Sequence, residues 1–204
     1  MPATDNRVQL QLKRGAKDPL LQGPLLSPLK PFGGVMFPYT PVITYDVQAE
    51  WTEFSLTHTN YQPQIYAKTK NPTIQISNAT FTATTEEDAR YMFAVTHFFR
   101  TITKMSFGVK DPNRGSPPPV LEFYAYGDAV FRCVPVVVTN FNIVYPNDVD
   151  YVQVKIGNTN VNVPVKQDIS IGLRVNMPMN DVKNTFTLGD FASGALVKTK
   201  KGYI

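Results

Sequence analysis

Few side chains in this 204-residue sequence could perform acid–base, nucleophilic or metal chemistry. There are two histidines, His58 and His97, and neither has a partner at the His-x-x-x-His or Glu-x-x-His spacing that sets two ligands on one helix face. We interpret both as structural histidines with local hydrogen bonds. The one cysteine, Cys133, lies in the apolar run 130–134, so we expect a small core residue rather than a nucleophile, and no intrachain disulfide can form.

The remaining candidate for chemistry is an acidic pair after a turn signal. Asp148 and Asp150 could bind a cation, but alternation along a strand would place both on one solvent-facing side, and we prefer that interpretation. The sequence also has no Gly-x-Ser-x-Gly motif, no phosphate-binding glycine loop and no dinucleotide fingerprint. We therefore predict no catalytic residue, no cofactor and no metal site, and we do not expect an enzyme.

The composition favours a β-rich protein that is stabilised by packing or by assembly. Seventeen prolines and twelve glycines are more than long helices tolerate, while 43% hydrophobic and 12% aromatic residues suffice for a core. No apolar stretch reaches the roughly 18 residues of a membrane span, and no secretory signal is evident, so we expect assembly in the cytoplasm without membrane insertion.

The net charge of +4 is concentrated near the two ends of the sequence. Residues 1–30 contribute 5 − 2 = +3 and residues 181–204 contribute 4 − 2 = +2, which leaves 4 − 3 − 2 = −1 for all residues between them. A nearly neutral body is a poor match for a protein that grips phosphates, whereas basic ends suit contacts with other surfaces.

One helix is predicted at residues 85–103. Thr84-Thr85-Glu86-Glu87 is a capping-box pattern, in which the Thr84 hydroxyl and the Glu87 carboxylate satisfy each other's backbone amides. Apolar side chains then recur at spacings of three and four, which predicts one buried stripe. These side chains are Tyr91, Ala94, Val95, Phe98, Phe99 and Ile102.

Strand patterns occupy much of the remaining sequence. The ranges are 42–53, 73–81, 120–126, 129–145, 151–156 and 161–175. We predict a hairpin turn at Gly127-Asp128, another at 157–160, and a bulge or sheet edge at Pro135. Residues 56–70 are predicted to form an irregular or hairpin-like excursion, and residues 108–116 an exposed loop.

These patterns divide the chain into three parts. Residues 1–34 are predicted to form an extended N-terminal arm with leucine anchors between prolines, residues 35–175 a β domain, and residues 176–204 a C-terminal arm. The predicted class is mainly β (α+β), with one helix beside a β-barrel or sandwich.

Six segments between residues 35 and 175 follow one another in a recognisable order. They are 82–100, 104–108, 117–121, 134–138, 146–151 and 163–165. Over about residues 35–175 this order resembles the tail-tube-like domain of baseplate tube-initiator proteins from contractile-tailed bacteriophages. The resemblance implies a virion protein of the tail baseplate, either a tube initiator or a tube-like adaptor, that forms a six-fold homo-oligomeric ring, initiates the tube and lines the DNA channel. The implied partners are the tail-tube protein, hub and wedge proteins and the tape-measure protein, while DNA passes without specific binding.

Two sets of residues are hypothesised to make these contacts. The ring or stacking interface would use Tyr61, Tyr66, Lys68, Asp111 and Arg114. The arm contacts would use Leu25, Leu26, Leu29, Leu196, Lys198 and Lys200. Deleting residues 1–30 should then abolish hub binding and leave the body folded. The alternative is a β-sandwich receptor- or glycan-binding tail module that uses Trp51 and surface tyrosines as stacking platforms.

Overall fold

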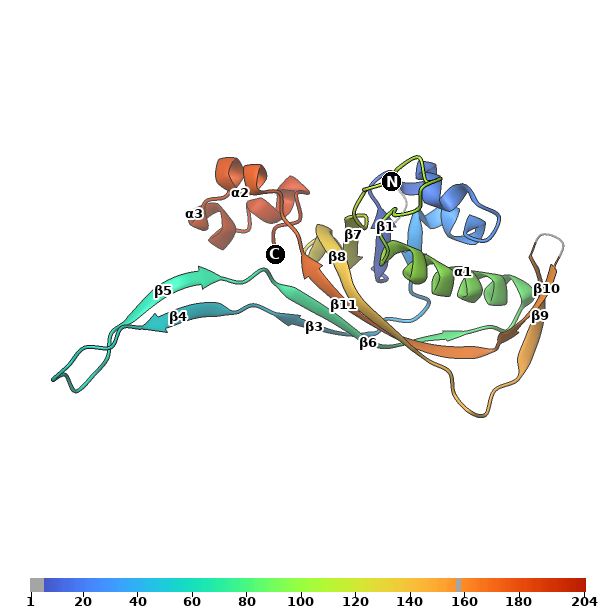
Figure 1. The fold of residues 1–204 in the computed structure, drawn as a ribbon, viewed down its shortest axis with the longest axis horizontal. Coiled ribbons are helices and arrows are strands. Elements are labelled where there is room, and N and C mark those ends of the chain that lie inside the picture. Colours follow the sequence, from blue (N-terminus) through green and yellow to red (C-terminus); the bar gives the residue numbers. More distant parts are fainter. Residues whose placement is uncertain (1–5, 157–158) are drawn as a thin grey trace.

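A seven-stranded antiparallel sheet forms the body of the protein (Figure 1). The computed structural model describes residues 6–156 and 159–204. The strand order is β2-β1-β7-β8-β11-β6-β3. The strands are β1 (Gln9–Leu12), β2 (Gly34–Met36), β3 (Val42–Asp46), β6 (Thr73–Thr82), β7 (Leu121–Ala125), β8 (Phe131–Val144) and β11 (Lys166–Val175). Two hairpins extend from this sheet: β4 (Ala49–Glu53) with β5 (Gln64–Thr69), and β9 (Tyr151–Ile156) with β10 (Thr159–Pro164).

Helix α1 (Glu86–Ile102) covers one face of the sheet, within one residue of the predicted helix at each end. Five residues of the predicted stripe are buried, and Tyr91 is half-buried. The predicted capping box is wrong by one residue, because Thr85 is the N-cap and Asp88 its reciprocal partner. Asp88 accepts from both Thr84 and Thr85, and these hydrogen bonds hold the pKa of its carboxyl below the usual range.

A buried polar link fixes α1 to the sheet. The Thr96 hydroxyl donates to Oε1 of Gln167 on β11 at 3.1 Å, and the Gln167 amide donates to the Met92 carbonyl at 3.3 Å. Both side chains are buried, and each polar group is paired, so burial costs little here. Around this link the helix packs on apolar side chains of β6 and β11, among them Phe81 and Leu173.

The opposite face of the sheet is polar and nearly free of net charge. Alternation along β3, β6, β8 and β11 turns small hydroxyl and amide side chains to this face. They include Thr44, Thr73, Gln75, Ser77, Thr80, Asn140, Asn142 and Ser170. The charged residues of β3, β6 and β11 are Asp46, Lys166, Asp168 and Arg174, whose charges sum to zero, and the one charged residue of β8, Arg132, is paired with Asp128 at 3.4 Å. We call this surface the polar sheet face.

The N-terminal segment packs into the body, so the prediction of an extended N-terminal arm is wrong for the described residues. Strand β1 lies between β2 and β7, and Val8, Leu10 and Leu12 enter the core. Three short 3-10 helices follow, η1 (Gly15–Lys17), η2 (Pro19–Gln22) and η3 (Ser27–Phe32). The alternating apolar residues fit a strand, and a partner more than a hundred residues away in sequence completes the pairing.

The C-terminal segment also folds back, so an extended C-terminal arm is not observed. It forms α2 (Met179–Thr185), α3 (Leu188–Ala192) and η4 (Leu196–Thr199). The Tyr203 hydroxyl donates to the Asp181 carbonyl at 3.0 Å, and Tyr203 is buried. Gly202, with φ +78°, lies against the backbone of Cys133 and leaves no room for a Cβ.

The predicted class, mainly β (α+β) with one principal helix, is confirmed, and the described strands do not close into a barrel. The predicted run 42–53 breaks between β3 and β4, and the run 161–175 between β10 and β11. The irregularity between β7 and β8 falls at Cys133, with φ +56°, instead of Pro135. Gly157 and Asn158 of the predicted turn lie outside the described residues.

Candidate assembly surfaces

A long β-hairpin leaves the body as a projecting arm (Figure 1). We call residues 47–72, which comprise β4, β5 and their connections, the hairpin arm. It continues the direction of β3 and β6 beyond the end of the sheet, and none of its residues is buried. The sequence-predicted excursion at 56–70 is therefore the outer part of a regular hairpin.

Both faces of the hairpin arm present apolar side chains to solvent. Trp51 pairs with Tyr66 across the two strands, with ring centroids 5.5 Å apart, and these side chains are 55% and 50% exposed. The next pair, Thr52 with Ile65, points to the opposite face, where Ile65 is 56% exposed. A two-stranded hairpin is at best marginally stable in water, and this one lacks a covered face within the described chain. Such a surface is typical of a contact with another molecule.

The two edges of the seven-stranded sheet differ. At β2, the Tyr91 hydroxyl accepts from the Met36 amide at 2.8 Å and donates to the Met36 carbonyl at 2.7 Å, so this side chain closes the edge. Burial raises the pKa of Tyr91 to about 12. At β3, the described residues supply a strand neighbour on one side only, β6. The edge along β3 and β4 is thus open to another strand.

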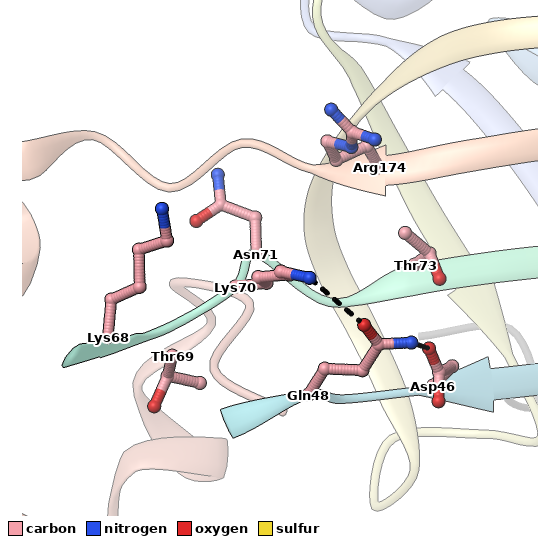
Figure 2. Close-up of a pocket in the computed structure, with 8 residues that line it drawn as sticks. All are labelled: Asp46, Gln48, Lys68, Thr69, Lys70, Asn71, Thr73 and Arg174. Carbon is pink, nitrogen blue, oxygen red and sulfur yellow. Dashed lines mark hydrogen bonds between the residues drawn. The ribbon is translucent and has the colours of Figure 1, made fainter. Parts of the chain in front are cut away.

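A polar pocket of about 550 Å³ lies where the hairpin arm joins the sheet (Figure 2). We call it the root pocket. It is lined by Asp46, Gln48, Lys68, Thr69, Lys70, Asn71, Thr73 and Arg174. The Lys70 ammonium donates to Oε1 of Gln48 at 3.4 Å, and Nε2 of Gln48 donates to Asp46 at 2.9 Å. Three cations and one carboxylate line the pocket, so its charge is positive.

The predicted ring or stacking residues fall into two separate places. Tyr61, Tyr66 and Lys68 lie on the hairpin arm, and Tyr61 is 90% exposed. Asp111 and Arg114 lie in the loop after α1, outside the hairpin arm, where the Arg114 amide donates to the Asp111 carbonyl at 3.1 Å. The structure therefore brings the first three residues together, and it leaves the loop pair as a distinct surface.

The predicted arm contacts divide into buried leucines and exposed lysines. Leu26, Leu29 and Leu196 are buried within the body, and Leu25 is half-buried. Because the described segments pack inward, the three buried leucines stabilise the monomer and are not presented to a partner. Lys198 and Lys200 remain exposed.

The residues considered for chemistry do not converge. His58 lies exposed on the hairpin arm, whereas His97 is half-buried on α1 with the Phe93 ring 4.5 Å away. Burial, followed by the charge of Arg100, lowers the pKa of His97. In the part of the chain that the structure describes, no three His, Cys, Asp or Glu side chains group as metal ligands.

Cys133 differs from the small core residue that was predicted. It is half-buried at the bulge and lines a cavity of about 490 Å³ together with Lys13, Lys200 and Lys201. Beside it, burial raises the pKa of Tyr124, whose hydroxyl donates to Glu122 at 3.0 Å.

The root pocket and the polar sheet face were not identified from the sequence. Alternation along 166–175 already set Arg174 on the polar side of a predicted strand, so this part of the pocket could have been found. Gln48 and Asn71 could not, because they line the pocket only where the hairpin arm leaves the sheet close to Arg174 of β11. None of the helices among the described residues is long and apolar enough to cross a membrane.

No protein-family model matches the chain, and no curated protein matches it.

Proposed function

We propose that this chain is a structural protein of a contractile phage tail, which forms a homo-oligomeric ring between the baseplate hub and the tail tube. In this role it initiates tube assembly and lines the DNA channel, without catalysing a reaction. The proposal starts from the resemblance of residues 35–175 to tube-initiator proteins. The observation that supports it best is the hairpin arm.

The hairpin arm suits a protein whose stable state is an assembly. Its apolar side chains on both faces need cover from two sides, which one neighbouring copy and a stacked ring would provide. The open β3 edge would be paired by the next copy around the ring, whereas the β2 edge is already closed by Tyr91 and needs no such partner.

The polar sheet face suits the wall of a DNA channel. Hydroxyl and amide groups keep the wall hydrated, and the charges of β3, β6 and β11 sum to zero. A wall without excess positive charge would not hold DNA by releasing counterions from its phosphates. The covered face, with α1, would then form the outer layer of the ring.

Assembly can be tested with the full chain and an arm-shortened variant. The Lys70 amide donates to the Gln48 carbonyl at 2.8 Å, so a short Gly-Ser turn can replace residues 49–69 at a point where the strands already meet. Each protein is mixed with the tail-tube and hub proteins of the same phage, and particles are sized by light scattering and imaged by electron microscopy.

We expect six-fold rings from the full chain and none from the arm-shortened variant, although circular dichroism should show that both are folded. The proposal fails if the full chain remains monomeric in every mixture. It also fails if the arm-shortened variant forms the same rings.

A glycan- or receptor-binding module is the second candidate. The exposed Trp51–Tyr66 pair favours it, because such aromatic faces stack on sugar rings. This role predicts a monomer or trimer whose glycan-array signal disappears in a Trp51→Ala variant. Six-fold rings without any glycan signal would exclude it.

A further inference from the structure

We propose that the root pocket of one copy binds the acidic turn of the next copy around the ring. The acidic turn is residues 146–150, which connect β8 to β9 and contain Asp148 and Asp150. This inference rests on the proposed ring and names the side chains that join neighbours. It identifies the partner of the pocket as a second copy of this chain.

The cations of the root pocket are incompletely neutralised within one copy. Lys68 and Lys70 share a single carboxylate oxygen of Glu50, at 3.6 and 3.9 Å, which are long distances for ion pairs. All three side chains are largely exposed, so these pairs contribute little. Each ammonium therefore retains the capacity to donate to another anion.

Arg174 has no anionic partner among the residues that the structure describes. It lies in one row across the sheet with Thr73 and Asp46, in the order β11, β6, β3. Two strand spacings, or roughly 10 Å, separate the backbones of Arg174 and Asp46, and no ion pair joins their side chains. The planar guanidinium remains available for a bidentate carboxylate from outside.

The acidic turn has the complementary properties. Asp148 and Asp150 are exposed, and within the described chain neither side chain has a hydrogen bond or an ion pair. The turn protrudes below the sheet at the end of the molecule opposite the hairpin arm (Figure 1). The Val165 amide donates to the Asp150 carbonyl at 2.9 Å and holds the base of the turn. A convex acidic turn thus faces outward at one end, and a basic hollow lies toward the other.

These positions favour a second copy as the occupant. The two sites lie apart in one chain and cannot meet within it, but a head-to-tail contact would join them repeatedly and can close a ring. The pocket volume of about 550 Å³ is adequate for a few inserted side chains. If two copies approached so that pocket met pocket or turn met turn, like charges would face each other. The contact between pocket and turn would therefore also fix the relative orientation of neighbouring copies.

Charge reversal provides the test. One variant carries Arg174→Glu and another carries Asp148→Lys with Asp150→Lys, and each is mixed with the tail-tube and hub proteins. We expect each variant alone to require a roughly 30-fold or higher protein concentration for ring formation. With Arg174→Glu, two cations and two carboxylates line the pocket, so its net charge no longer attracts the acidic turn; with the two aspartates reversed, a basic turn faces a basic pocket.

An equimolar mixture of the two variants should restore rings. In an alternating ring the unmodified acidic turn meets an unmodified basic pocket, and the reversed turn meets the pocket that has lost a cation and gained a carboxylate. An even number of copies permits this alternation. The matched control is Lys17→Glu, which makes the same kind of charge change at an exposed position on η1, outside the hypothesised contact sets, and should assemble as the unmodified chain does. Circular dichroism of each variant checks that it is folded.

The outcomes separate the two proposals. If the unmodified chain forms no ring, the proposed function fails, and this inference fails with it. If rings form but the reversed variants assemble normally, or their mixture is no better than either alone, only the present inference is overturned. It is also overturned if Arg174→Glu leaves ring formation unchanged and weakens binding to a short DNA duplex, since the pocket would then serve phosphates.

Discussion

Replacing Leu10 with alanine is expected to destabilise the whole body, because β1 is an internal strand of the sheet. Leu10 is fully buried, and its cross-strand neighbours are Val35 on β2 and Phe123 on β7, which are also fully buried. The substitution removes three carbon atoms from a close-packed site. Lost transfer free energy and the remaining cavity together lower the free energy of unfolding by about 3 kcal/mol. In a chain of this length that corresponds to a fall in Tm of roughly 6 to 12 °C.

The assay is thermal and urea unfolding followed by far-ultraviolet circular dichroism. Tryptophan fluorescence is unsuitable, because the single tryptophan, Trp51, lies exposed on the hairpin arm and not in the core. Leu188→Ala is the matched control, since Leu188 is 74% exposed on α3 and its truncation should change stability by less than about 0.5 kcal/mol.

A Leu10→Ala variant as stable as the Leu188→Ala control would refute the role of β1 in the core. Because β1 is an internal strand, the expectation from the sequence that the body stays folded without residues 1–30 is reversed. Removing residues 1–30 takes β1, η1 and η2 from the body and exposes β7, so the product should be unfolded rather than a folded body without hub binding.

Four further predictions concern the helix cap, a sheet edge and the C-terminal segment. Thr85→Ala should lower the free energy of unfolding by about 1 kcal/mol in urea titration. Hydrogen bonds lower the pKa of Asp88 in the folded state, so its carboxylate stabilises the fold fully above the ordinary carboxyl pKa and loses this effect as the pH falls through the folded-state pKa. The difference in unfolding free energy between the unmodified chain and Asp88→Asn should therefore vanish in acid. Tyr91→Phe leaves the Met36 amide and carbonyl without their partner and should cost about 1 to 3 kcal/mol. Gly202→Ala should speed tryptic cleavage of the C-terminal segment, whereas Gly189→Ala, in open space, should not.

Local patterns predicted the helix and most strands correctly, because the information lies in adjacent residues. The apolar stripe at spacings of three and four predicts α1, and the threonines and acidic residues at 84–88 mark where the helix begins. The cap was misplaced by one residue because Thr84 and Thr85 each precede an acidic residue by three positions, and only the backbone conformation of Thr85 selects it.

The placement of elements could not be predicted in the same way. Val8, Leu10 and Leu12 show strand alternation, but whether this segment is an arm or an internal strand depends on a pairing with β7, far along the chain. Similarly, Trp51 and Ile65 have the apolar character of core residues, and only the direction of the hairpin shows that they are exposed. The root pocket lies where the hairpin arm leaves the sheet, and Arg174 joins its lining from β11, so it is a tertiary feature.

The pairing of β1 with β7, and of β6 with β11, has a consequence for how quickly the protein matures. These contacts join residues roughly a hundred positions apart, so the sheet has a high contact order and should close slowly, on a scale of milliseconds to seconds. The contacts between β4 and β5 in the hairpin arm join residues close together in the sequence and can form in microseconds. During synthesis the arm would thus form before β11 has left the ribosome, and newly made chains would display it ahead of a finished body.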